Sequence, residues 1–170
     1  MNNECLPDRL GISAMQVLLS ERPAGGSNME PFDRLIGEWS LEIIDIAPNG
    51  TETRLAGSWH FFFGLGGRAI LDVWQVPGRE HGLTVRFYDP STDAWRSTWI
   101  SPCGGIVMPF IGRRVNDEFV LEHDDRDKGI ISRWIFFEVT NTTFRWRGEG
   151  STDGGKSWRV EQMMLGKRIT

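Results

Sequence analysis

In the segment Pro31-Phe32-Asp33-Arg34-Leu35-Ile36-Gly37-Glu38-Trp39, helical signals give way to strand signals. Pro31 suits the first position of a short helical turn. Trp39 stands near the start of the first of many segments with strand character. We therefore expect the turn to cover one end of a β-barrel whose first strand begins at about residue 38.

Eight tryptophans are distributed over the segments that follow, on nearly every candidate strand. Trp is large, and its indole N–H requires a partner when it is buried. Strands that carry so many rings must close around either a ring-filled core or a cavity with aromatic walls. The tryptophans are Trp39, Trp59, Trp74, Trp95, Trp99, Trp134, Trp146 and Trp158.

Short runs of Gly, Asn, Asp and Pro divide the chain after Gly37 into ten candidate strands. These turn residues favour hairpins between consecutive strands, so we predict an all-β fold, a closed antiparallel barrel of about ten strands in meander order. Closure removes the sheet edges, and ten strands leave room for a ligand. The candidate strands are residues 38–46, 53–63, 67–76, 82–89, 94–101, 105–114, 118–124, 130–140, 143–150 and 157–168.

The first thirty residues have a different character. Ser13 is a candidate cap for a short helix that extends to about Glu21, and residues 23–27 form a Pro- and Gly-rich link. We predict two parts, an N-terminal helix and linker over residues 1–30 and a barrel domain over residues 31–170. The helix is expected to pack on the outside or the end of the barrel, with a lid or a dimer contact as the alternative.

Composition excludes several classes of function. The 170 residues suit one domain, and the net charge of −4 gives no basic stripe for nucleic acid. Only two cysteines, Cys5 and Cys103, indicate a reduced cytoplasmic protein, with a disulfide between them as the alternative. No signal peptide and no run of about 18 apolar residues is present, so export and membrane insertion are not expected. A homodimer is left open.

Neither a metal nor a cofactor is expected. His60, His81 and His123 have no metal-ligand spacing, although haem ligation by His60 or His123 stays an alternative. The segment 124–129 is rich in Asp but lacks the spaced oxygen ligands and closing Glu of a calcium loop, so we interpret it as a solvated turn.

Gly37-Glu38-Trp39 has the Gly-x-Trp pattern of lipocalins and related calycin barrels. The resemblance implies that Trp39 closes the bottom of the cavity beneath an arginine from the end of the barrel. Arg168 is the residue best placed for this contact, which is worth about 0.5–2 kcal/mol.

Most of the chain, from Phe32 to Arg168, resembles a family of small bacterial lipocalin-like proteins with no assigned function. The resemblance implies a lipocalin-like barrel and brings no catalytic residues with it. It rests on Phe32-Asp33-x-Leu35-Ile36-Gly37-x-Trp39, Leu65-Gly66-Gly67-Arg68, Thr84-x-Arg86-x-Tyr88-Asp89-Pro90, Trp95 with Trp99, and Ser151-x-Asp153-Gly154-Gly155-x-Ser157-Trp158.

The last of these motifs also fits the Asp-box pattern of sialidase propellers. Its Ser and Asp side chains can accept N–H groups of a turn, its glycines permit positive φ, and its Trp can cover the turn. Sialidases repeat the motif, whereas it occurs once here. We therefore expect it to stabilise a hairpin and not to indicate a glycosidase.

Alternation along the strands leaves open which faces point inward. Asp72 and Trp74 share one face of their strand, and Arg86 and Tyr88 share one face of the next. Hydrophobicity favours the opposite, apolar faces inside. The Thr84-x-Arg86-x-Tyr88 pattern and the position of Trp74 favour the polar faces. An enclosed Asp72–Arg86 pair would be costly to desolvate, so it would indicate function.

We expect the barrel to bind a small hydrophobic, aromatic molecule in a Trp-lined cavity. Asp72, Arg86 and Tyr88 would recognise a carboxylate, carbonyl or hydroxyl group of the ligand. The ligand-binding candidates are Trp59, Trp74, Arg86, Tyr88, Trp99, Met108, Trp134 and Trp146.

Two other functions are weighed against binding. The first is a cofactor-independent enzyme, an isomerase, cyclase or lyase, in the same cavity. Asp72 or Glu149 would be its catalytic acid or base, with a pKa raised by burial, and Arg86 or Tyr88 would stabilise an enolate. The second is a structural or partner-binding barrel whose tryptophans only fill the core.

Overall fold

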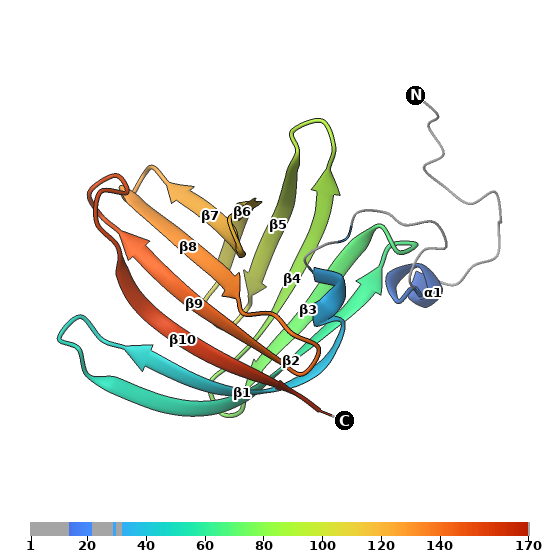
Figure 1. Ribbon diagram of the computed structural model, residues 1–170, viewed down its shortest axis with the longest axis horizontal. Helices are drawn as coiled ribbons and strands as arrows, with labels where there is room; N and C mark the ends of the chain where they lie inside the picture. The colour runs from blue at the N-terminus through green and yellow to red at the C-terminus, as the bar shows by residue number, and fades with distance from the viewer. Residues whose placement is uncertain (1–13, 22–28, 30–31, 170) are drawn as a thin grey trace.

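The computed structural model describes residues 14–21, 29 and 32–169 and shows a closed barrel of ten antiparallel strands (Figure 1). Each strand pairs with the next one along the chain, and β1 pairs with β10 to close the barrel. The predicted fold class, a lipocalin-like meander barrel, is confirmed. The strands are β1 (Gly37–Ile46), β2 (Glu52–Gly64), β3 (Ala69–Val76), β4 (Glu80–Asp89), β5 (Ala94–Ser101), β6 (Ile106–Val115), β7 (Glu118–Asp125), β8 (Ile130–Phe137), β9 (Thr143–Ser151) and β10 (Arg159–Arg168).

A short 3₁₀ helix, η1 (Phe32–Leu35), covers the end of the barrel at which β1 begins and β10 ends (Figure 1). We call this the plugged end. Phe32 is fully buried, and its ring lies 4.9 Å from Trp95, 4.8 Å from Phe119 and 5.7 Å from Phe136 between centroids. The opposite end, formed by hairpins such as β1–β2 and β9–β10, is the far end. The predicted helical plug is confirmed.

The predicted contact between Arg168 and Trp39 is also confirmed. The guanidinium carbon of Arg168 lies 4.1 Å from the ring centre of Trp39, which is fully buried. Arg168 donates hydrogen bonds to the backbone oxygens of Ile36 and Arg34, both at 2.7 Å. The indole of Trp39 donates to Leu35 O at 2.6 Å. These bonds fasten η1 to the first and last strands.

The N-terminal helix α1 (Ala14–Leu18) lies beside the β2–β3 hairpin on the outside of the barrel (Figure 1). Ser20 N donates to Phe63 O at 3.0 Å, and Gly66 N donates to Val17 O at 3.3 Å. The helix is shorter than the predicted range 13–21. It packs on the outside of the barrel, as the first of the two expectations stated. The predicted link at 23–27 and Cys5 lie outside the described residues, while Cys103 is an exposed free thiol.

The Asp-box hairpin has the predicted structure. Asp153 Oδ1 accepts from the backbone N–H groups of Lys156 and Ser157 at 2.9 and 3.0 Å, and Ser151 Oγ accepts from Gly155 N at 2.9 Å. Trp158 donates to the carbonyl of Gly155 at 3.1 Å. The motif therefore stabilises the β9–β10 turn at the far end.

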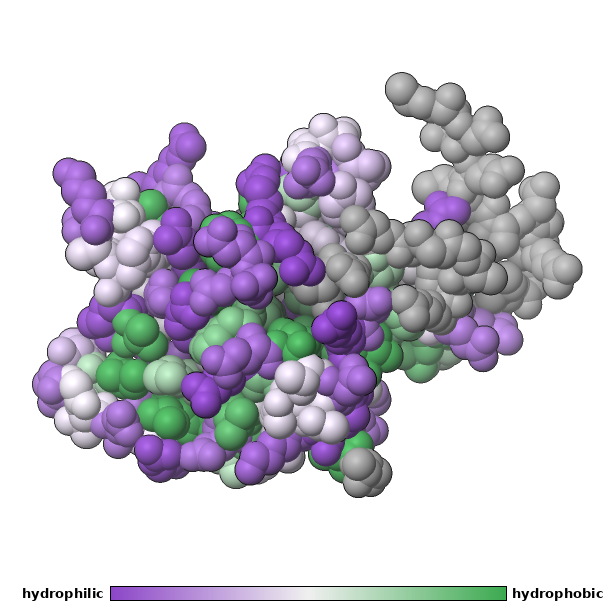
Figure 2. Space-filling model, in the orientation of Figure 1, coloured by the Kyte–Doolittle hydropathy of each residue, from purple (hydrophilic) through white to green (hydrophobic). Residues whose placement is uncertain are grey.

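Hydrophobicity favoured the wrong inward faces for β3 and β4. Asp72 and Arg86 are fully buried inside the barrel, whereas Phe87 of β4 is 48% exposed on the outside. Figure 2 shows that hydrophobic side chains also lie among the hydrophilic ones on the outer surface over β1 and β10. The interior therefore contains polar groups although apolar side chains were available on the same strands.

Candidate functional site

Five tryptophans form a connected set of rings inside the barrel, and we call this set the tryptophan belt. Its members come from β2, β3, β5, β8 and β9, and consecutive rings lie 5.7–6.4 Å apart between centroids. Each of these contacts is edge-on, an arrangement favoured by aromatic quadrupoles. In order of contact the belt is Trp74, Trp99, Trp134, Trp146 and Trp59. All five are among the predicted ligand-binding residues.

An interior glycine makes space for one member of the belt. Gly82 on β4 pairs with Trp74 of β3. The other neighbour of β4 is β5, which carries Trp99. A Cβ atom at Gly82 would lie 1.8 Å from the ring of Trp99. Because no side chain stands there, the Trp99 ring can lie against β4.

A polar cluster built on Asp72 lies beside the belt, between β2, β3 and β4. Asp72 Oδ2 lies 2.5 Å from Arg86 Nη2, and Oδ1 accepts from Trp59 Nε1 at 2.6 Å and from Thr84 Oγ1 at 3.1 Å. Burial raises the pKa of Asp72, against the opposing effects of Arg86 and the two hydrogen bonds. Burial also lowers the pKa of Arg86, against Asp72. The cluster holds one positive and one negative charge away from water.

Several buried groups near this cluster have no hydrogen-bond partner among the described residues. Arg86 has two such atoms, Nε and Nη1, and the others are Asp72 Oδ2, Ser97 Oγ, Trp74 Nε1 and Trp146 Nε1. All of these except Asp72 Oδ2 can donate a hydrogen bond. A buried donor without a partner costs about 1–3 kcal/mol, and buried polar groups in folded proteins are nearly always satisfied. Among these groups the buried donors without partners outnumber the acceptors, so the interior could satisfy an acceptor brought from outside the chain.

The other predicted residues lie at different places. Met108 pairs with Trp99 across β5 and β6 and is half-buried beside the belt. Tyr88 lies toward the plugged end, where its hydroxyl donates to Asp93 at 2.6 Å and this bond raises its pKa. Glu149 points outward and accepts from Arg147 at 2.6 Å. The structure therefore does not bring Tyr88 or Glu149 to Asp72.

Two residues of the interior were missing from the predicted site. Thr84 bonds Asp72, and Ser97 stands opposite Arg86 in the β4–β5 register. Ser97 is two residues from both Trp95 and Trp99, so strand alternation alone places it on their face. The inward position of Ser97 could therefore have been predicted from its spacing to these two tryptophans.

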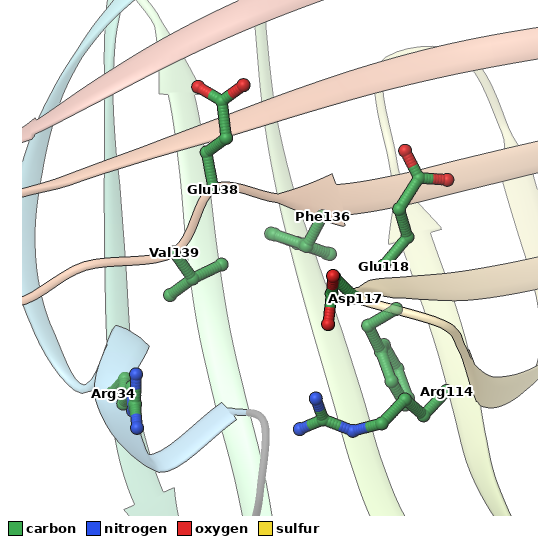
Figure 3. Close-up of a pocket in the computed structure, with 8 residues that line it drawn as sticks. Arg34, Arg114, Asp117, Glu118, Phe136, Glu138 and Val139 are labelled. Atoms are coloured by element: carbon green, nitrogen blue, oxygen red, sulfur yellow. The ribbon is translucent and has the colours of Figure 1, made fainter.

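A pocket of about 370 Å³ lies at the plugged end, outside η1 (Figure 3). In Figure 3 the guanidinium groups of Arg34 and Arg114 lie on one side, and the carboxylates of Glu118 and Glu138 point away from them. Glu118 is bound by Arg147 at 2.7 Å, and Glu138 by Arg145 at 3.1 Å. None of the predicted site residues lines it. Its lining is Arg34, Arg114, Asp117, Glu118, Phe119, Phe136, Glu138 and Val139.

A second pocket, of about 470 Å³, opens in the side wall between β5, β6 and β7, and we call it the side pocket. Its volume lies within the range of about 300–1,000 Å³ typical of small-molecule sites. One of its residues, Phe110, stacks on Trp134 of the belt at 4.3 Å. The lining is Thr92, Arg96, Pro109, Phe110, Ile111, Arg113, Glu122, His123 and Asp124.

Across residues 14–21, 29 and 32–169, no group of three or more His, Cys, Asp and Glu side chains is arranged to hold a metal ion. None of the helices within these ranges is long and apolar enough to cross a membrane.

No family model and no curated protein matches the chain. Among solved structures, the S-type phycobiliprotein lyase CPES of Guillardia theta superposes with a TM-score of 0.55. The match covers 86% of this chain and 94% of the lyase chain at 12% sequence identity. The two proteins share the calycin-type barrel fold.

Proposed function

We propose that the barrel binds a small aromatic molecule against the tryptophan belt and that the molecule carries at least one oxygen acceptor. The observation that carries this proposal is the set of buried donors without partners, on Arg86, Ser97, Trp74 and Trp146. A core that only filled space would gain nothing from these groups, because each costs free energy when it is left unpaired. An acceptor brought by a ligand would satisfy them.

The charge of the site favours a neutral acceptor, such as a carbonyl, over a carboxylate. Arg86 is already balanced by Asp72 at 2.5 Å, so the buried cluster has no net charge. A further buried anion would need its own counter-charge, at a cost of several kcal/mol. A carboxylate could enter only if Asp72 took up a proton, and burial already raises the pKa of Asp72 in that direction.

Acid–base catalysis in the barrel interior is the second candidate. It is favoured by the raised pKa of Asp72 and by the occurrence of the same fold in a lyase. Oδ1 of Asp72 accepts from Trp59 and Thr84, and Oδ2 lies 2.5 Å from the Arg86 guanidinium, in an ion-pair contact without hydrogen-bond geometry. A general base needs a lone pair directed at the substrate, so this arrangement fits a positioning role better than proton transfer.

The test compares three ligands of similar size: acetylnaphthalene, ethylnaphthalene and naphthoate. Binding is followed by quenching of tryptophan emission at equilibrium. We expect acetylnaphthalene to bind about 2- to 12-fold more tightly than ethylnaphthalene, the gain from one net hydrogen bond of about 0.5–1.5 kcal/mol. Naphthoate should bind more weakly at pH 8 and improve as the pH falls. Equal affinities for all three would count against the donor argument.

Variants separate ligand contact from stability. Trp74→Phe keeps an aromatic ring and removes one unpartnered donor, so it should reduce the preference for acetylnaphthalene. Trp158→Phe is the matched control, because Trp158 lies outside the barrel with Arg133 stacked on it at 3.8 Å. An identical response of the two variants would refute the assignment of Trp74 to the site.

A further inference from the structure

The wall of the barrel is incomplete between β6 and β7. These strands pair over only five residue pairs, from Val115↔Glu118 to Ile111↔Glu122. Both strands continue toward the far end, since β6 still pairs with β5 at Ile106 and β7 still pairs with β8 at Asp125. Residues 106–110 and 123–125 therefore face each other without ladder bonds, and we call these two segments the seam.

Pro109 accounts for the end of the ladder. Proline has no backbone N–H, so it cannot donate to a neighbouring strand. Its carbonyl oxygen accepts instead from the side chain of His123, with Nδ1 at 2.7 Å. A side-chain hydrogen bond thus stands where a backbone ladder bond would be expected, and rotation of one imidazole would release it.

Two rings of the seam, those of Phe110 and His123, lie between the side pocket and the tryptophan belt. Phe110 is 2% exposed and lines the side pocket. Its centroid lies 4.3 Å from Trp134 of the belt and 5.6 Å from His123. Side-chain rotation of Phe110 and His123 would connect the side pocket with the belt, and the backbone hydrogen bonds of the barrel would stay intact.

The far end is held more firmly. Asp45 on β1 accepts hydrogen bonds from Arg79 of the β3–β4 hairpin and from Gln162 of β10, the latter at 2.6 Å. Val76 and Ser101, which end β3 and β5 there, are buried. Entry through this end would require a charge-assisted bond and a second hydrogen bond to break, whereas the seam has a single bond to one imidazole.

We propose that the side pocket is the entrance by which a neutral aromatic molecule reaches the tryptophan belt, with Phe110 and His123 as the side chains that move. The identity of the occupant rests on the proposed function, whereas the entrance rests on the seam. Wall chemistry suits such a ligand: Phe110, Ile111 and Pro109 supply apolar surface. An entrance that does not contact the bound molecule changes rates and leaves affinity unchanged.

Three variants test the entrance by stopped-flow mixing with acetylnaphthalene. Pro109→Thr restores the N–H and allows the ladder to continue, so association and dissociation should both slow by about tenfold. His123→Ala removes the closing hydrogen bond and should accelerate both rates. Asp45→Asn loosens the far end and is the control, with rates unchanged. Affinity should stay within about twofold throughout, because none of these residues belongs to the belt or the polar cluster.

A second readout needs no ligand. Acrylamide quenching of tryptophan emission, in a Trp158→Phe background, reports access to the buried rings. Quenching should rise in His123→Ala and fall in Pro109→Thr. Failure of acetylnaphthalene to bind the unmodified protein would overturn the proposed function, and quenching would then decide the entrance alone. Faster rates or stronger quenching in Asp45→Asn, with no effect of the seam variants, would place the entrance at the far end and overturn this proposal.

Discussion

Removing either partner of the Asp72–Arg86 pair should destabilise the protein, but the two losses should depend differently on pH. Both side chains are fully buried and lie 2.5 Å apart. In Asp72→Leu the guanidinium keeps its charge, because arginine does not deprotonate at accessible pH. The unpaired buried cation should cost about 3–5 kcal/mol at every pH from 5 to 7.

In Arg86→Met the remaining carboxyl group can take up a proton. Burial raises the pKa of Asp72 even with Arg86 present, so in this variant the folded-state pKa lies further above the unfolded value of about 3.9. The folded state then binds the proton more tightly than the unfolded state does. Stability is therefore greatest at low pH and falls as the pH rises toward the folded-state pKa. At 1.36 kcal/mol per unit, the cost is limited to about 4 kcal/mol at pH 7 and about 1.5 kcal/mol at pH 5.

Urea unfolding at pH 5, 6 and 7, followed by tryptophan emission, measures both effects. With a slope of about 2 kcal/mol/M, the midpoint of Arg86→Met should move by up to about 0.7 M per pH unit relative to the parent chain. The double variant Asp72→Leu/Arg86→Met should fall within about 1 kcal/mol of the parent or exceed it, because no buried charge is left. Equal, pH-independent losses in the two single variants, or a double variant that sums them, would refute the reasoning.

Three further outcomes follow from the structure. Arg168→Lys cannot reproduce the flat contact with Trp39 or the bonds to backbone carbonyls, and should lower thermal stability by about 2 kcal/mol, which a melting curve would detect. Gly82→Ala should displace Trp99, cost about 1–3 kcal/mol and weaken acetylnaphthalene binding in the same titration; unchanged affinity would contradict the position of the ring. Bonds from Ser157 and neighbouring groups lower the pKa of Asp153 to about 2, so the stability advantage over Asp153→Asn should be full above about pH 4 and shrink toward pH 2 in urea titrations, whereas a constant difference would contradict it.

Turn chemistry predicted most of the fold. Each hairpin contains Gly, Asn, Asp or Pro between strand-forming runs, and local rules need no knowledge of the partner strand. The largest error in a strand boundary is at β8, which ends at Phe137 and not at residue 140. Glu138 has φ +49°, a left-handed conformation that residue type did not indicate, since Asn and Gly are the usual occupants.

The candidate site was less predictable, because the inward face depends on register. A shift of one residue exchanges the faces of a strand, and hydrophobicity favoured the wrong face for β3 and β4. One constraint was available within single strands: Glu149 is three residues from Trp146, so the two cannot share a face. Tyr88 does share the face of Arg86, but it lies at the plugged end, and strand alternation gives no position along the barrel axis.

The Asp72–Arg86 pair and the seam both lack an explanation in stability. A buried ion pair is often no more stable than apolar side chains of the same volume, and the chain has apolar residues on the opposite faces of β3 and β4. Pro109 likewise removes a ladder bond from the middle of a closed sheet, where almost any other residue would supply one. Both features lie against Trp59 or Trp134 of the belt. A binding site inside a closed barrel needs both features. The ion pair would recognise a polar group of the ligand, and the seam would let the ligand exchange with solvent.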